Sequence, residues 1–455
     1  MKGMLEKQAM GLTRQQIIQV AVLLFGCLLS ELNYTLLAPA LPVIMSDLSV
    51  GETDVQWLMS AYALVEAVVI PLNAFFLGRF STRKLFAGSF ALFAAGSAVI
   101  AAGPSFAWLM AGRALQAFAT GVVITMSTTL VLLIAPRESR GRMMGLLGLV
   151  ISFAPAIGAP ASGGLVDIVG WRVLLVGVAV LAVAIAVVGA ASLRNHEGFE
   201  RTSFDVPSVV LSCAGMVGFL WGVSTVTDSD TPWVSALVMA AGVGVLVVFA
   251  RRQSKLEVPM LRVETLRMRQ FRTAVILCCL MEAALLAIDV LLPLLLENSL
   301  GASPTETGFA MMPAALVGGA AGIVSGRLFD RYGVRKVAVP GIIVVLGSAT
   351  GLCFVGLDTS VMFVAVLYMV ETLGWQMMST PTNTWGINSL PNDIIQHGTA
   401  VLDTLMQVGA AFGTATIVSL SALAPGIDGY RYGFIGCAAL LAVVAVMVIA
   451  AVRDR

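Results

Sequence analysis

Mostly apolar runs alternate with short polar segments along the 455-residue chain. A bilayer core of about 30 Å is crossed by a helix of roughly 17–25 residues, and each apolar run reaches that length. The expected spans are 16–43, 54–77, 85–102, 106–133, 142–165, 172–192, 206–224, 232–250, 271–296, 307–326, 337–356, 359–386, 397–422 and 430–452. The pattern predicts an all-α integral membrane protein with fourteen transmembrane helices.

Basic residues mark one set of loops. If the amino terminus lies in the cytoplasm, all 27 Lys and Arg residues fall on the cytoplasmic side except Arg172, Arg431 and Arg113, the last of which lies within a span. Short loops rich in Lys and Arg remain in the cytoplasm during insertion. We therefore expect a multi-pass protein with both termini cytoplasmic. The first apolar run is too long for a signal-peptide core, so we expect it to remain as the first span.

The composition agrees with a membrane protein and excludes other classes. Hydrophobic residues make up 58% of the chain and charged residues 12%, whereas soluble domains carry about 25% charged residues. The net charge is +1, and no basic surface with interleaved aromatic residues indicates a nucleic-acid partner. All six Cys lie within expected spans, so we expect neither disulfides nor a metal site.

The sequence also lacks the motifs that enzymes use. It contains no Gly-Lys-Ser/Thr nucleotide motif, and it shows no nucleophile paired with a base. His196 falls in an expected loop and His397 at the edge of one, and neither has further metal ligands beside it. We expect a protein that is not an enzyme and that holds no cofactor.

A basic turn occurs twice in the chain. RFSTRK at 79–84 and RYGVRK at 331–336 each follow the second span of a six-span block. Repeats of this kind in transporters indicate two bundles related by an axis along the membrane normal. We expect an amino-terminal six-helix bundle at 1–192, two extra helices with linkers at 193–270, and a carboxy-terminal six-helix bundle at 271–455.

Several segments carry a resemblance to a known family. They are GRLFDRYGVRK at 326–336, RALQ at 113–116, PAIGAP at 155–160, FDVP at 204–207, NYTLL at 33–37, VQWL at 55–58 and RFSTR at 79–83. The first looks like the signature loop of the major facilitator superfamily, and the next two resemble its fourth-span motif and the fifth-span motif of its proton antiporters. The others, with the two extra spans, are similar to fourteen-span drug:proton antiporters, in particular the lincomycin-resistance-type multidrug exporters of bacteria.

The resemblance covers nearly the whole chain. It implies a monomer in the bacterial cytoplasmic (inner) membrane, with protons as the coupling ion and small-molecule drugs as partners. Two positions depart from the family pattern. Gly78 stands where the first-half loop of the superfamily has Asp, and Asn33 stands where related antiporters often carry an acid. Glu31 lies about 200° around the helix from Asn33, so we do not assign it the role of that acid.

Six acids fall within expected spans, where a charge costs about 2.5–3.5 kcal/mol. They are Glu31, Glu66, Glu282, Asp289, Glu371 and Asp403. The one basic residue at comparable depth, Arg113, cannot neutralise all of them. Protons and cationic ligands both fit the remainder, so we assign these acids to substrate and proton binding. The alternative is that each acid is protonated and forms a structural interhelical hydrogen bond.

Other candidate site residues are polar or aromatic. Glu282 and Asp289 are seven residues apart, so they share a helix face with about 10.5 Å of rise between them. Tyr34 and Trp375 could form part of an adaptable, low-specificity wall. The remaining candidates are Asn33, Arg113 and Gln116. A buried Arg113 needs an acid or carbonyl groups as partners, and the family resemblance implies that it takes part in proton coupling.

Two segments are candidates for a conformational switch. Pro155, Gly158 and Pro160 predict a bent, closely packed fifth span that seals one bundle against the other, with ordinary small-residue packing as the alternative. Asp330 can accept bonds from a neighbouring helix amino terminus, which predicts a cytoplasmic latch; the alternative is a loop that only marks topology. The other switch candidates are Arg79, Arg83, Lys84, Gly326, Arg331, Gly333, Arg335 and Lys336.

Together these features favour a secondary transporter that exports amphipathic, often cationic drugs in exchange for protons. Export would proceed by rocking of the two bundles about a site at mid-membrane. Two alternatives stay open at this point. One is a dedicated exporter of a single endogenous metabolite, and the other is a membrane sensor or scaffold that transports nothing.

Overall fold

The computed structural model describes residues 12–196, 205–225 and 232–452, and every regular element in these ranges is helical. The long helices are α2 (Arg14–Leu36), α4 (Glu52–Val69), α6 (Thr82–Ala102), α7 (Phe106–Ile134), α8 (Arg140–Val169), α9 (Trp171–Ser192), α10 (Val206–Thr225), α11 (Pro232–Gln253), α12 (Arg269–Asn298), α13 (Pro304–Tyr332), α14 (Val334–Leu352), α15 (Val361–Ile387), α16 (Ile395–Ser421) and α17 (Ile427–Ala451). Thirteen helical segments of the described residues are long and apolar enough to cross a membrane. With α8, which has 30 residues, the expected all-α membrane architecture is confirmed.

Prolines interrupt the first two spans. The pieces are the 3₁₀ turn Ala38–Ala40 and α3 (Leu41–Leu48) after α2, and the 3₁₀ turn Ile70–Leu72 and α5 (Asn73–Arg79) after α4. Pro39, Pro42 and Pro71 lie in the first turn of the piece that each begins, where the missing N–H costs no helical hydrogen bond. The spans expected at 16–43 and 54–77 are therefore not single continuous helices.

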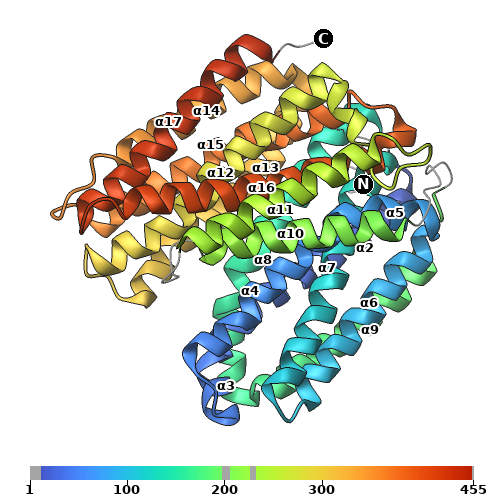
Figure 1. Ribbon diagram of the computed structural model, residues 1–455, viewed down its shortest axis with the longest axis horizontal. Helices are drawn as coiled ribbons and strands as arrows, with labels where there is room; N and C mark the ends of the chain where they lie inside the picture. The colour runs from blue at the N-terminus through green and yellow to red at the C-terminus, as the bar shows by residue number, and fades with distance from the viewer. Residues whose placement is uncertain (1–11, 197–204, 226–231, 453–455) are drawn as a thin grey trace, which may run out of the picture.

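The long helices pack in two groups of six. Helices α2, α4 and α6–α9 pack with one another and form the amino-terminal bundle, and α12–α17 form the carboxy-terminal bundle. Figure 1 shows the first bundle in blue to cyan beside the second in yellow to red. The start of α2 and the end of α17 lie toward the same end of the helices, which we call the terminal side. The opposite end, where α3 lies, is the far side.

The two extra helices form a hairpin that touches both bundles. α10 and α11 pack mainly on each other, while α10 also contacts α4 of one bundle and α16 of the other. In Figure 1 the hairpin, in green, lies across the middle of the molecule. It therefore bridges the two bundles on one face.

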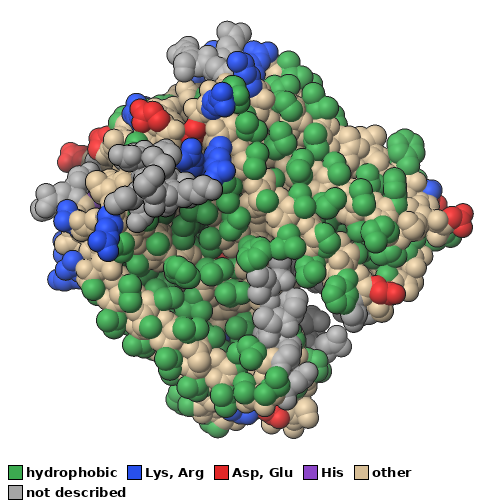
Figure 2. Space-filling view, turned by 180° about the vertical axis from the view of Figure 1, so that it is seen from behind, with side chains coloured by type: hydrophobic (Ala, Val, Ile, Leu, Met, Phe, Trp, Pro, Cys, Tyr) green, Lys and Arg blue, Asp and Glu red, His purple; other side chains and the backbone are tan. Residues whose placement is uncertain are grey.

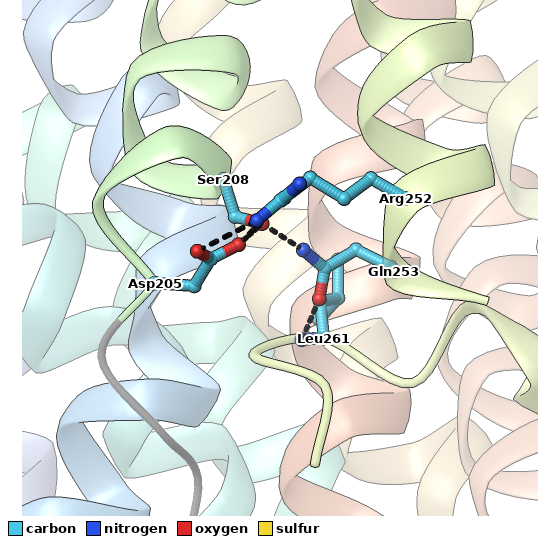
Figure 3. A network of polar contacts seen from close by, with 5 residues as sticks. All are labelled: Asp205, Ser208, Arg252, Gln253 and Leu261. Carbon is cyan, nitrogen blue, oxygen red and sulfur yellow. Dashed lines mark hydrogen bonds and ion pairs between the residues drawn. The ribbon is translucent and has the colours of Figure 1, made fainter. Parts of the chain in front are cut away.

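A polar network joins the terminal-side ends of this hairpin (Figure 3). Arg252 donates to both carboxylate oxygens of Asp205, at 2.7 and 3.0 Å. Gln253 donates to the Ser208 hydroxyl at 2.6 Å and accepts from the backbone N–H of Leu261 at 3.0 Å. The hydrogen bond from Arg252 lowers the pKa of Asp205 to about 2, so this carboxylate stays charged at neutral pH.

The apolar core runs from one bundle into the other on the terminal side. One cluster of buried side chains includes Leu130 and Leu147 of the amino-terminal bundle together with Ile387, Leu390 and Ile395 of the carboxy-terminal bundle. A second cluster belongs to the carboxy-terminal bundle, and a third belongs to the far-side part of the amino-terminal bundle. The bundles are thus joined at the terminal side and have separate cores toward the far side.

The outer surface is apolar over its middle. Figure 2 shows hydrophobic side chains across most of one face and Lys and Arg gathered along an edge. Val180 is 63% exposed, Leu237 63% and Val446 68%. A monomeric soluble protein rarely exposes so much contiguous apolar surface, whereas a lipid-facing surface is expected to be apolar. The molecule is a multi-pass membrane protein.

Candidate functional site

A cavity of about 760 Å³ lies between the two bundles. Its walls come from α2 and α8 on one side and from α12, α13 and α15 on the other. Most of the lining surface is apolar, and the polar or aromatic lining residues are Glu31, Tyr34, Ser152, Glu282, Asp289, Phe309, Tyr368, Thr372, Trp375 and Gln376. This volume and mixture are typical of a site for a small organic molecule.

The cavity lies toward the far side of the molecule. Gly308 and Met312, near the start of α13, line it, as does Asp289 near the far-side end of α12. At its inner limit, the Gln376 amide donates to the Ser152 hydroxyl across the two bundles at 3.0 Å. The bundles therefore meet on the terminal side of the cavity and diverge on its far side.

Three of the six predicted acids line this cavity. Glu31 projects from α2, and Glu282 and Asp289 project from α12, as expected for two residues on one helix face. The hydroxyl of Tyr368 donates to Asp289 at 2.7 Å. No described Lys, Arg or His forms an ion pair with any of the six acids. The carboxyl groups in the cavity are therefore not neutralised by a basic side chain of the described chain.

The other three acids lie outside the cavity lining. Glu371 is 1% exposed on α15, and one of its carboxylate oxygens is buried without a hydrogen-bond partner, as is one oxygen of Glu282. Glu66 is half-buried on α4. Asp403 lies one turn beyond Thr399 on α16. Burying a carboxylate oxygen without a partner costs free energy. A bound proton or cation would remove this cost at Glu371 and Glu282.

Arg113 is fully buried in the amino-terminal bundle and is held by carbonyl groups. Its guanidinium donates to the backbone oxygens of Leu58 at 3.1 Å and of Asn33 at 3.2 Å. The central carbon of the guanidinium (Cζ) lies 4.2 Å from the centre of the Tyr62 ring, which is a cation–π arrangement. The sequence allowed either an acid or carbonyl groups as partners of Arg113. The hydrogen bonds given above are to backbone carbonyl groups.

Asn33 and Gln116 belong to the same buried network. The Asn33 amide donates to Gln116 at 3.1 Å, and the Gln116 amide donates to the Ser97 hydroxyl at 2.8 Å. Asn33 and Gln116 are both 0% exposed, whereas the neighbouring Tyr34 lines the cavity. Asn33 and Arg113 therefore lie behind the cavity wall, and Glu31 and Tyr34 form the wall itself.

Polar contacts hold the bundles together on the terminal side. Both carboxylate oxygens of Asp330 accept backbone N–H bonds from the first turn of α8, from Gly141 and from Arg142, each at 2.8 Å. This is the type of contact that the sequence predicts for Asp330. The Arg140 guanidinium donates to the side-chain oxygen of Asn388 across the bundles at 2.8 Å.

Glycines bring α8 and α13 into backbone contact beside these bonds. A Cβ added at Gly326 would overlap the carbonyl group of Gly141, and one at Gly145 would overlap the carbonyl group of Gly322. Small residues permit this approach. We call the four glycines, with Asp330, the terminal seam.

Gly158 is not part of this seam. A Cβ at Gly158 would overlap the Thr35 hydroxyl of α2, so it packs within its own bundle and not across to the other. The side chains of Pro155 and Pro160 lie outside the described residues. The expected seal between bundles is made at Gly141 and Gly145, about four to five turns before Gly158 in α8, because the helices come together at their terminal-side ends.

Two basic residues of the repeated turns make contacts within their own bundle. The Arg83 guanidinium donates to the backbone oxygen of Leu193 in its own bundle at 3.1 Å, and the Arg331 guanidinium lies over the Tyr332 ring at 5.1 Å. Gly333 has φ of +83°, which explains a glycine at the turn between α13 and α14. All six basic residues of these turns are exposed, namely Arg79, Arg83, Lys84, Arg331, Arg335 and Lys336. Among the switch candidates, Asp330 and Gly326 carry the described cross-bundle contacts.

Three features of the site did not emerge from the sequence. Tyr368 lies seven residues before Trp375 and shares its cavity-lining face, so helical periodicity counted from Trp375 could have found it. Phe309 lies in the second turn of α13, and no motif in the sequence distinguished it from other apolar residues of that span. The Arg140–Asn388 bond joins two distant segments, and nothing in their spacing indicates it.

Comparison with known proteins identifies the family. The model for the Major Facilitator Superfamily matches residues 23–414. The chain belongs to the major facilitator superfamily. This family consists of transporters and not of enzymes.

The relatives are bacterial transporters. The chain is 37% identical to an uncharacterized MFS-type transporter, YcnB, of Bacillus subtilis (strain 168) over 88% of this chain and 85% of the relative. It is 31% identical to the lincomycin resistance protein LmrB of the same organism over 89% and 85% of the two chains. The resemblance to lincomycin-resistance-type proteins is therefore confirmed. A multidrug resistance protein B homolog of Mycobacterium tuberculosis (strain ATCC 25618 / H37Rv) is 26% identical over 87% of this chain and 74% of the relative.

Solved structures share the fold. The human organic anion transporter MFSD10 (TETRAN) is similar with a TM-score of 0.72 at 14% identity, covering 96% of this chain and 100% of that one. The proton:xylose symporter XylE, bound to 6-bromo-6-deoxy-D-glucose, is similar with a TM-score of 0.63 at 15% identity, covering 95% and 94%. At these identities the likeness shows a common architecture.

Proposed function

We propose that the protein exports amphipathic, often cationic compounds across the bacterial cytoplasmic membrane in exchange for protons. The observation that carries this proposal is the cavity with three carboxyl groups and no basic partner among the described residues. Carboxyl groups in a low-dielectric site bind either a proton or a cation. A proton and a cationic compound would therefore compete for the same groups, which couples their movements in opposite directions.

The lining of the cavity favours binding of cations that also carry apolar groups. Tyr34, Tyr368 and Trp375 can place aromatic faces against a cation, and Met311 and Met312 are flexible apolar groups. Apolar area contributes affinity without strict geometry, so one cavity can accept several shapes. The relatives whose names include lincomycin resistance and multidrug resistance are consistent with this substrate class.

Direction follows from topology. We take the terminal side as cytoplasmic because the basic loops lie there, so the cavity faces outward in this conformation. Opening of the terminal seam with closure of the far side would give the inward-facing state by rocking of the two bundles. A potential of 100 mV supplies about 2.3 kcal/mol per net elementary charge moved across the membrane, which corresponds to a concentration ratio of roughly fifty. We propose that a monomer carries this cycle, with protons as the coupling ion and no other cofactor.

Transport into inverted membrane vesicles tests the proposal. Several labelled cationic drugs of different shape should accumulate when a proton gradient is imposed, and an uncoupler should abolish the accumulation. Empty-vector vesicles provide the background. Accumulation that persists with the uncoupler would rule out proton coupling. Transport of a single compound from a broad panel would indicate a dedicated exporter, and absence of all transport would remove the proposal.

A further inference from the structure

A second pocket lies at the terminal side of the amino-terminal bundle. It has a volume of about 370 Å³ and is enclosed by the ends of α2, α6, α7 and α9. It shares no lining residue with the cavity between the bundles. Its size falls in the range of small-molecule sites, and the export cycle described above makes no use of it.

Gln19 supplies the first evidence that this pocket takes a ligand. Its side chain lines the pocket, is only 7% exposed, and forms no hydrogen bond within the described ranges of the chain. An amide carries two donors and an acceptor, and the Gln19 amide is not among the polar groups that are sealed off without a partner. It therefore faces the open volume of the pocket, where a ligand can bond to it.

The charge of the residues around the pocket favours an anionic ligand. Arg194 lines the pocket, and the lining includes no Asp or Glu among the described residues. Thr13 and Thr82 also line it, at the amino-terminal ends of α2 and α6, where helix dipoles favour an anion. Thr82 is 2% exposed and accepts a bond from the backbone N–H of His196 at 3.3 Å, so its own hydroxyl hydrogen remains to donate.

The opposite wall of the pocket is apolar. Leu130, Leu133 and Ile134, at the end of α7, line it. An anion alone would gain nothing from this wall, whereas a phosphate ester with a carbon skeleton would pack against it. The pocket opens near the level at which α2 begins, the membrane–water boundary of the terminal side.

We propose that this pocket binds a phosphate-bearing anionic group, the glycerophosphate headgroup of an anionic phospholipid. Gln19, Thr82 and Arg194 hold the phosphate oxygens, and the wall from α7 contacts the glycerol carbons. Binding ties together the terminal-side ends of four helices of one bundle and so stabilises that bundle as a rigid body.

Thermal unfolding of the purified full-length protein in detergent tests this site. Addition of phosphatidylglycerol should raise the melting temperature by several degrees over the same amount of phosphatidylcholine, which has no net charge. Glycerol 3-phosphate, added in a parallel series, distinguishes a soluble phosphate ester from a membrane lipid as the source of the headgroup. A shift with glycerol 3-phosphate equal to that with the lipid supports the phosphate site and assigns it to a soluble ligand.

Variants separate a specific site from general charge attraction. Arg194→Gln and Gln19→Leu should each remove most of the shift. Arg251→Gln, an exposed arginine on the same side of the molecule, should keep it. Arg194 is exposed, so its replacement leaves folding intact even if Gln19→Leu does not. Absence of a lipid-specific shift in the wild type, or an equal shift in wild type and Arg194→Gln, would overturn the proposal.

Discussion

The terminal seam and the cavity are built on opposite principles. At the seam, Asp330 has both carboxylate oxygens satisfied by backbone N–H groups, and glycines bring two backbones into contact. In the cavity, carboxyl groups lie without a described basic partner, and one oxygen of Glu282 has no hydrogen bond at all. At the seam the fold itself satisfies the acid, whereas the cavity leaves carboxyl groups that a ligand or a proton can satisfy.

This comparison also explains why acids of the same type serve different ends. Asp330 belongs to a structure that must be stable in one state and broken in the other. Glu31, Glu282 and Asp289 belong to a surface whose charge must change with occupancy. The difference between them lies in the partner supplied by the fold and not in the acid itself.

The largest effect is expected from filling the seam. Gly326→Ala places a methyl group against the Gly141 carbonyl, and overpacking of this kind costs about 3 kcal/mol at the upper end of the usual range. Transport should fall by roughly a hundredfold, because the terminal side cannot close. Labelling of a cysteine introduced beside the seam should become faster.

Gly347→Ala is the matched control for the seam, because a Cβ there meets no atom within 4 Å. It should transport at the wild-type rate. If Gly326→Ala folds and transports as well as Gly347→Ala, the close backbone approach is not needed for closure, and the contrast between seam and cavity loses its basis.

A smaller effect is expected from Asp330→Asn. The amide can accept from one N–H group of α8 but no longer carries the charge, and a hydrogen bond to a charged group contributes about 2 kcal/mol. The closed population should drop by roughly thirtyfold relative to the open one, with turnover reduced more than drug binding. Asp393→Asn, at an exposed acid on the same side, is the control, and equal cysteine labelling in the two variants would argue against a latch.

The smallest effect is expected on dye affinity, when an acid inside the cavity is compared with one outside it. Glu282→Gln should weaken binding of a cationic dye by about tenfold, or 1.4 kcal/mol, since the dye loses a direct charge partner. Glu371→Gln should leave dye affinity nearly unchanged, because Glu371 does not line the cavity. Dye titration of purified protein at fixed pH measures both, with Glu257→Gln as an exposed control. Equal losses from the two variants would contradict the division of the acids made by the structure.

The sequence predicted the helices better than the site. Apolar length is a local property, so the fourteen spans could be read directly, and even the bent second span was right in extent. The contact of Asp330 with a helix amino terminus was also foreseeable, because its chemistry allows few other partners at that place. The hydroxyl of Tyr368 beside Asp289 and the pairing of Arg140 with Asn388 depend on which helices lie side by side, and no local pattern encodes that.

Burial depth was the hardest property to predict. Glu371 and Glu282 both fall within expected spans, yet Glu371 is buried outside the cavity lining and Glu282 faces the cavity. A rotation of about 100° per residue decides which face a side chain occupies, and helix packing sets the reference for that rotation. The same reasoning separates Asn33, which is fully buried, from Tyr34, which lines the cavity.

The apolar cluster shared by the two bundles gives the transport cycle a thermal signature. Leu130 and Leu147 pack in one cluster with Ile387, Leu390 and Ile395, so opening the terminal side wets apolar surface that is dry in this conformation. Hydration of apolar surface raises the heat capacity. The enthalpy of opening therefore grows with temperature. As a result, a van't Hoff plot of the equilibrium constant between the two states of the transporter is curved and not straight.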